Sequence, residues 1–293
     1  MKFVKSILAG ISVTLGLVSA AVASPIVVGG KNFTEQQIIA EMTAQLLKAK
    51  GYEVDKRAGL GTAPLRQGQE SGQIDVYWEY TGTSLITFNK ITEKMDAETT
   101  YNTVKKLDEA KGLVWLNPSK VNSTYTLAMR ADEAKAKGLT SISELAAAVN
   151  GGDALKFGCN AEFYARPDGL KPFEKAYGFE FGRDNIVRMD FGLVYQALKD
   201  KQVDVSIALS TDGRIPAFDL VALKDDKGYF PSYAMTPVIR KAVLDENPKL
   251  ADLLNAISAK LDDETMTKLN SAVDVDRKSI EEVSSDFIAA NKF

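Results

Sequence analysis

A tyrosine followed by several hydroxyl groups marks a stretch of the sequence that is suited to binding a ligand. Residues 72–84 read GQIDVYWEYTGTS and begin with the alternation typical of a β-strand. Small hydroxyl residues and a glycine then break this alternation at 81–84, as in a loop or a helix start. Tyr80 is therefore expected at the end of a strand, where open α/β sheets bind ligands. The alternative, an aromatic core strand, is the one that we favour for Trp78.

A second stretch echoes this arrangement. QIDV at 73–76, with YT at 80–81, matches QVDV at 202–205, with LS at 209–210. Each copy follows a helix-like segment, so the echo predicts two similar helix–strand units, one in each lobe, with Tyr80 and Leu209 in corresponding places. A match this short can also arise by chance, and it says nothing about ligand chemistry.

Two cations are expected near helix starts. Lys31 follows a predicted strand at 26–29 and precedes a helix that Thr34 and Gln37 are predicted to open as a capping box. Arg166 begins the turn RPDGL, which starts another helix. Because free N–H groups at a helix start and a nearby cation both favour an anion, the pair indicates an anionic ligand group. The alternatives are a solvated lysine and a salt-bridged surface arginine.

The sequence lacks the residues that several kinds of chemistry require. The sequence has no histidine, which removes the commonest general base and metal ligand. Cys159 is the single cysteine, so no intrachain disulfide is possible, and its neighbours predict a buried strand. GLGT at 59–62 is not a P-loop because no G-K-[ST] follows. We predict no cofactor, no metal site and no catalysis, although paired carboxylates leave a secreted enzyme as an alternative.

The N-terminus predicts export. Lys2 and Lys5 precede a mostly apolar run at 7–18, and AVA at 21–23 fits cleavage near Ala23, so residues 1–23 are expected to be a signal peptide and the protein periplasmic. Its removal changes the formal charge from −3 to about −5, because two lysines are lost. A mildly acidic chain without a basic stripe argues against a nucleic-acid partner.

The rest of the chain predicts an α/β protein of two lobes. We assign 24–127 to the first lobe, 128–231 to the second, and 232–293 to a segment that returns to the first lobe and ends in helices. The weakly alternating segment 123–129 is the expected first crossing between lobes, and the extended segment 228–237 is the second.

Four segments together resemble a known family. They are VGGKNFTEQ at 28–36, DVYWEYTGT at 75–83, RPDGL at 166–170 and STDGRI at 210–215. In this order they resemble the glycine betaine/choline/carnitine-binding proteins of osmoprotectant ABC transporters, most nearly the OsmF-type branch. The resemblance implies a type II periplasmic binding protein, with two α/β lobes, a ligand cleft between them and two chain crossings.

The resemblance also implies site residues. Members of the family hold a quaternary ammonium group among tyrosine rings, because this group donates no N–H hydrogen bond and is attracted to aromatic faces. By motif, the cage is expected from Tyr80, Tyr125 and Tyr233. A clamp for the ligand's carboxylate is expected from Lys31, Thr83 and Arg166. Many relatives carry a fourth tyrosine where this sequence has Leu209.

The function implied by the resemblance is capture of a quaternary-ammonium osmolyte and its delivery to an ABC permease in the inner membrane, by a monomer that catalyses no reaction. Two alternatives stay open. The protein could bind another small zwitterionic solute, or it could present its ligand to a membrane receptor as a sensory binding protein.

The leucine at position 209 leads to a first prediction. A cation–π contact contributes about 0.5–2 kcal/mol, so its absence weakens betaine binding by roughly tenfold or more, or accompanies a change of preferred solute. Leu209→Tyr should therefore tighten the binding of glycine betaine, measured by calorimetric titration of both proteins. An unchanged dissociation constant would contradict the role assigned to position 209.

Overall fold

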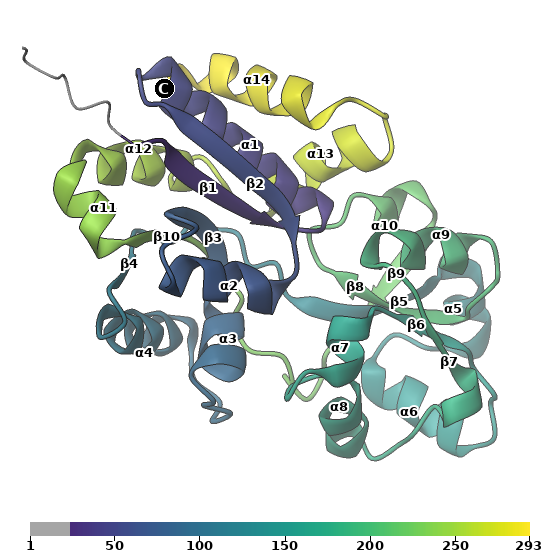
Figure 1. The fold of residues 1–293 in the computed structure, drawn as a ribbon. Coiled ribbons are helices and arrows are strands. Elements are labelled where there is room, and N and C mark those ends of the chain that lie inside the picture. Colours follow the sequence, from purple (N-terminus) through teal and green to yellow (C-terminus); the bar gives the residue numbers. More distant parts are fainter. Residues whose placement is uncertain (1–23) are drawn as a thin grey trace, which may run out of the picture.

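The protein consists of two lobes, each built around its own five-stranded β-sheet (Figure 1). The computed structural model describes residues 24–293, so the predicted signal peptide at 1–23 lies outside the described residues. Within 24–293, no helix has the length and apolar character that a membrane crossing requires. The fold class predicted from the sequence, two α/β lobes joined by two crossings, is confirmed.

The sheet of the first lobe has the strand order β2-β1-β3-β10-β4. β1 pairs in parallel with β2 and β3, whereas β10 is antiparallel to β3 and β4. Its strands are β1 (Ile26–Lys31), β2 (Val54–Leu60), β3 (Val76–Tyr80), β4 (Leu113–Trp115) and β10 (Met235–Arg240). The late strand β10 thus brings the chain back between two early ones.

Helices surround this sheet, and α1 packs against β1, β2 and the C-terminal helix α14. The spacing of Ile38, Met42 and Leu46 puts all three on one fully buried face of α1, as their period predicts. The helices of this lobe are α1 (Thr34–Ala49), α2 (Thr62–Glu70), α3 (Thr81–Thr83), η1 (Ser84–Phe88), α4 (Ala97–Glu109), α11 (Lys241–Glu246), α12 (Lys249–Ser258), α13 (Asp263–Asp274) and α14 (Ile280–Asn291).

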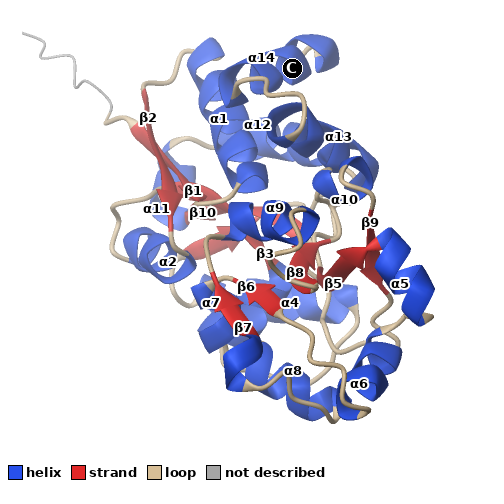
Figure 2. Cartoon of the chain, turned by 90° about the vertical axis from the view of Figure 1, so that its right-hand side faces the viewer, coloured by secondary structure: helices blue, strands red, loops and turns tan. Residues whose placement is uncertain are grey.

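The sheet of the second lobe has the order β7-β6-β8-β5-β9. Its strands are β5 (Tyr125–Arg130), β6 (Phe157–Cys159), β7 (Ile186–Arg188), β8 (Val205–Leu209) and β9 (Leu220–Leu223). Its helices are α5 (Ala131–Lys137), α6 (Ile142–Asn150), α7 (Ala161–Ala165), α8 (Leu170–Tyr177), η2 (Arg183–Asn185), η3 (Phe191–Leu193), α9 (Val194–Lys199) and α10 (Arg214–Ala217). In Figure 2, α6 and α8 lie at one end of the molecule and α1, α12 and α14 at the other.

The two crossings lie side by side. Asn122, just before β5, forms an isolated antiparallel bridge with Ala234, just before β10. The side-chain oxygen of Asn122 also accepts a hydrogen bond of 2.7 Å from the backbone N–H of Tyr233. The two segments that connect the lobes therefore lie next to each other and are bonded to each other. The exact division at 24–127, 128–231 and 232–293 stays a prediction.

The predicted capping box at the start of α1 is wrong. The cap position is Phe33, whose side chain forms no cap hydrogen bond, and the Thr34 hydroxyl instead donates to Asp274 at 2.7 Å. A tertiary partner from α13 therefore replaces the local one. Lys31 is likewise the last residue of β1 rather than part of the following loop. The expectation that Cys159 is buried is confirmed, and burial raises the pKa of its thiol to about 12.

A buried ion pair joins helices α2 and α4 and gives a second prediction. Arg66 of α2 donates two hydrogen bonds, of 2.9 and 2.6 Å, to the carboxylate of Asp108 in α4. Asp108→Asn removes the buried, bidentate partner of the guanidinium and leaves it only the partly exposed Glu70, so the free energy of unfolding should fall by about 3 kcal/mol, measured by urea denaturation.

The exposed pair of Lys241 and Asp245 supplies the matched control, because Asp245→Asn should change the free energy of unfolding by less than about 1 kcal/mol. Burial alone would raise the pKa of Asp108, but the hydrogen bonds from Arg66 lower it to about 2 from the usual 3.8. The stabilisation by Asp108 is thus present above pH 3.8 and lost as the pH falls towards 2. Equal losses in both variants would contradict this account.

Candidate functional site

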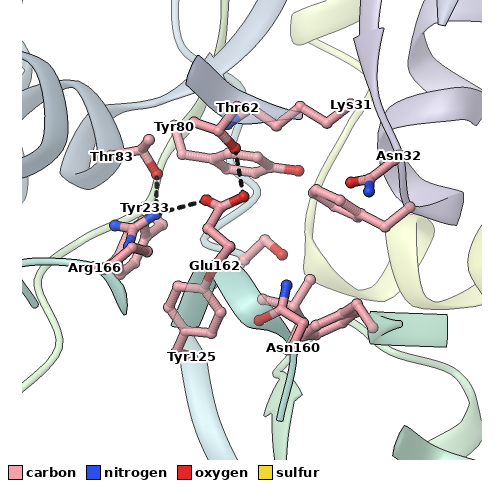
Figure 3. Close-up of a pocket in the computed structure, with 14 residues that line it drawn as sticks. Lys31, Asn32, Thr62, Tyr80, Thr83, Tyr125, Asn160, Glu162, Arg166 and Tyr233 are labelled. Carbon is pink, nitrogen blue, oxygen red and sulfur yellow. Dashed lines mark hydrogen bonds and ion pairs between the residues drawn. The ribbon is translucent and has the colours of Figure 1, made fainter. Parts of the chain in front are cut away.

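Residues of both lobes line a small cavity of about 30 Å³ (Figure 3). All seven residues predicted for the site line it, although they come from distant parts of the chain: Lys31, Tyr80, Thr83, Tyr125, Arg166, Leu209 and Tyr233. The structure thus brings the predicted cage and clamp together at the interface of the lobes. Their role in binding a ligand stays a prediction.

The three tyrosines sit at strand ends near the crossings. Tyr80 is the last residue of β3, Tyr125 is the first of β5, and Tyr233 lies two residues before β10. The rings of Tyr125 and Tyr233 meet edge to face, with centroids 5.6 Å apart and planes at 85°. Phe33 extends the wall, because it stacks on Tyr80 with centroids 6.3 Å apart. The cavity therefore presents both ring faces and ring edges.

Gly82 makes the approach of Tyr233 possible. A Cβ atom at this position would lie 2.9 Å from Cε1 of the Tyr233 ring and 2.8 Å from the carbonyl oxygen of Ser232. Any side chain at position 82 would push the segment before β10 away from β3. The glycine of the TGT sequence thus has a packing role beyond loop formation.

Two of the tyrosine hydroxyls are held by buried carboxylates. Tyr80 donates a 2.7 Å hydrogen bond to Glu35, and Tyr233 donates one of 2.8 Å to Asp168. Burial raises the pKa of both phenols well above 10, as well as that of Tyr125, so the rings stay neutral and electron-rich at physiological pH. No hydrogen bond of the Tyr125 hydroxyl is found among residues 24–293, which leaves this ring fixed by packing alone.

Lys31 is buried and paired rather than solvated. Its Nζ lies 2.6 Å from Oε1 of Glu79 and 5.0 Å from the centroid of the Tyr80 ring. Glu79 is itself fully buried and also accepts hydrogen bonds from the hydroxyl of Tyr77 and the backbone N–H of Tyr80. The charge of Lys31 is therefore largely neutralised, with two ammonium hydrogens left for another acceptor.

Arg166 forms a bidentate pair with Asp168. Its Nε and Nη2 each donate to Asp168 at 2.7 Å, and its Nη1 lies 3.5 Å from Oγ1 of Thr83 across the interface of the lobes. The guanidinium carbon also lies 5.5 Å from the centroid of the Tyr125 ring. Arg166 follows α7 directly and precedes the turn into α8, as its RPDGL sequence predicted. It is buried, so the alternative of a surface arginine is wrong.

Leu209 lies opposite Tyr125 in the sheet, since the two residues are register partners in β8 and β5. Its backbone N–H donates a 3.0 Å hydrogen bond to the hydroxyl of Tyr195. The strands β3 and β8 end at Tyr80 and Leu209, so the correspondence predicted from the sequence echo is confirmed. Leu209 contributes an apolar wall without a ring.

Half of the residues that line the cavity were not predicted from the sequence. Asn32 and Phe33 lie in the KNF segment that carried the resemblance, Thr62 ends the GLGT segment, and Ser123 begins the predicted first crossing. Asn160, Glu162 and Phe191 gave no local signal, because only the packing of the second lobe brings them to the cleft. The residues that were not singled out are Asn32, Phe33, Thr62, Ser123, Asn160, Glu162 and Phe191.

Comparison with known proteins gives consistent matches over the described chain. The profile of the OpuAC family, described as the substrate binding domain of ABC-type glycine betaine transport system, matches residues 24–290. The glycine-betaine-binding protein of Pseudomonas aeruginosa is 47% identical over 274 residues, which cover 92% of this chain and 88% of that protein. The glycine betaine-binding protein YehZ of Escherichia coli is 36% identical over 291 residues, or 96% and 95% of the two chains.

A solved structure described as a glycine betaine/carnitine/choline ABC transporter superposes with a TM-score of 0.74 at 27% identity, over 91% of this chain and 98% of that one. This match extends over both lobes. It therefore supports the arrangement of the two sheets as well as the folds of the single lobes.

Glu35 gives a third prediction, because it is buried without a salt bridge among residues 24–293. Its carboxylate accepts hydrogen bonds from Tyr80, from Thr211 at 2.6 Å and from Asn270 at 3.2 Å. Burial raises its pKa above 4.5, against the opposing effect of the hydrogen bonds from Thr211 and Tyr80. The folded protein then holds the proton more tightly than the unfolded chain, so stability should decline as the pH rises from 4.5 through the raised pKa.

Glu35→Gln removes this titration. The variant should show a smaller loss of unfolding free energy between about pH 4.5 and 7.5 than the parent protein, measured by urea denaturation at a series of pH values. Glu180→Gln, at a side chain that is 73% exposed, is the control and should leave the pH profile unchanged. Parallel profiles for Glu35→Gln and the parent would show that Glu35 has no raised pKa.

Proposed function

Because the chain belongs to the OpuAC family of substrate-binding domains of ABC-type glycine betaine transport systems, we propose that it captures glycine betaine or a similar quaternary-ammonium osmolyte between its lobes. The protein is a substrate-binding protein of a transport system and not an enzyme. Its partner within such a system is the ABC permease, to which the captured solute is delivered.

The observation that carries the proposal is the convergence of Tyr80, Tyr125 and Tyr233 in one buried cavity between the lobes. A trimethylammonium group offers no N–H to hydrogen-bond acceptors, so the negative faces of neutral rings are its natural partners. Phe33 and Phe191 add further rings to the lining, and their centroids lie 6.1 Å apart across the interface. Phe191 supplies an aromatic surface from the second lobe, which Leu209 does not.

The charges around the cavity also favour a ligand with a positive group. Of the charged residues that line the cavity, Lys31 and Arg166 are each paired with a buried carboxylate behind the lining, and Glu162 adds a negative charge. A cationic head group entering this region therefore meets a formal excess of one negative charge. The proposed role of Lys31, Thr83 and Arg166 is to donate their remaining hydrogens to the carboxylate of a zwitterionic ligand.

Membership of the family indicates in general where the protein acts in the cell. Substrate-binding proteins of this family act outside the cytoplasm, in the periplasm or on the cell surface. The finer placement is part of our proposal: a periplasmic monomer, released after cleavage near Ala23, without a nucleic-acid partner.

Calorimetric titration with glycine betaine, choline, carnitine and proline betaine tests the proposal, and Tyr125→Leu is the informative variant. The hydroxyl of Tyr125 forms no hydrogen bond among residues 24–293, so the substitution removes a ring without stranding a buried carboxylate, as changes at Tyr80 or Tyr233 would. The parent protein should bind at least one of these ligands. Tyr125→Leu should weaken that binding by about tenfold, whether or not the ligand has a carboxylate.

Tyr52→Leu serves as the control, because Tyr52 packs in the first lobe away from the cavity and its loss should leave affinity unchanged. If none of the four ligands gives a heat of binding, the proposal is wrong and the protein binds another class of solute. Equal affinity of Tyr125→Leu and the parent protein would exclude Tyr125 from the cage.

A further inference from the structure

Glu162 places a carboxylate at the centre of the cleft (Figure 3). It belongs to the short helix α7, which the side chain of Asn160 caps through a 2.9 Å hydrogen bond from the backbone N–H of Phe163. In Figure 3 the Glu162 carboxylate lies between the ring of Tyr80 and that of Tyr125, facing Thr83 and Arg166. Its side chain is 31% exposed, so it is not locked in the core.

The two oxygens of Glu162 take donors from both lobes. Oε2 accepts a 3.0 Å hydrogen bond from the hydroxyl of Thr62 in the first lobe. Oε1 lies 3.3 Å from Nη1 of Arg166, which follows four residues later in the same lobe. Glu162 therefore bridges the lobes with its carboxylate, in the way that a bound carboxylate ligand would.

These donors are the ones that a ligand carboxylate would need. Nε and Nη2 of Arg166 are already directed at Asp168, which leaves Nη1 as the nitrogen that faces Thr83 and the cavity. That nitrogen is shared with Glu162. A second carboxylate at this place must displace Glu162 or lie beside it, and like charges this close repel each other strongly in a partly desolvated site.

A quaternary ammonium ligand that has no carboxylate is attracted by Glu162 instead of repelled. It needs neither Arg166 nor Thr62, and the charge of Glu162 attracts it. From this contrast, and resting on the proposed function, we propose that Glu162 is a specificity-determining residue: it competes with a ligand's carboxylate for Arg166 and Thr62, and so shifts preference from betaines towards carboxylate-free cations such as choline.

The test compares betaine with choline in the parent protein and in Glu162→Gln. Glutamine keeps the size of the side chain and an oxygen that can accept from Thr62, but it removes the charge. Calorimetric titration should show about tenfold tighter binding of glycine betaine and unchanged or weaker binding of choline. Glu162→Asp, which restores the charge, should return the preference towards that of the parent protein.

Glu180→Gln, on the exposed surface of the same lobe, is the matched control and should change neither affinity. Weaker betaine binding in Glu162→Gln, or an equal shift for both ligands, would overturn the inference, because it would make Glu162 a general contact or a structural residue. If neither ligand binds to any of these proteins, the proposed function itself fails, and the inference falls with it.

Discussion

The cleft depends on keeping two buried cations neutralised. A charged side chain in a largely desolvated place is costly unless it is paired and hydrogen-bonded. Lys31 is therefore held by Glu79, and Arg166 by Asp168. The same two carboxylates then position the aromatic rings, since Glu79 accepts from the backbone N–H of Tyr80 and Asp168 accepts from the hydroxyl of Tyr233. Charge pairing thus organises the walls of the cavity.

The contacts that join the lobes are of a different kind from those within them. Each lobe buries an apolar core of its own, and Tyr125 and Phe230 are shared at the border between the two. Across the interface, polar contacts such as Thr62 with Glu162 and Glu35 with Thr211 stand beside the rings of Phe33 and Phe191. Exposing the polar contacts to water costs less than separating apolar surfaces, as a hinge motion about the two crossings would require.

Local patterns in the sequence predicted what depends on local structure. The alternation before Tyr80 and before Leu209 located two strand ends, because side-chain period follows directly from strand geometry. The partners of buried charges could not be found in this way. Nothing near Thr34 points to Asp274, and the pairing of Lys31 with Glu79 joins residues of two different strands. Glu162 and Phe191 were missed for the same reason, since their places depend on how the second lobe packs.

The two ends of the proposed ligand site differ in how freely they can change. Asp168 holds both Arg166 and Tyr233, so a substitution at any of the three disturbs clamp and cage together. Leu209 stands apart from this network. Its backbone is fixed by Tyr195 and by pairing with Tyr125, whereas its side chain only fills space in the cavity. A leucine can therefore replace a ring there without loosening the frame, which makes this wall the place where affinity can vary while the fold remains intact.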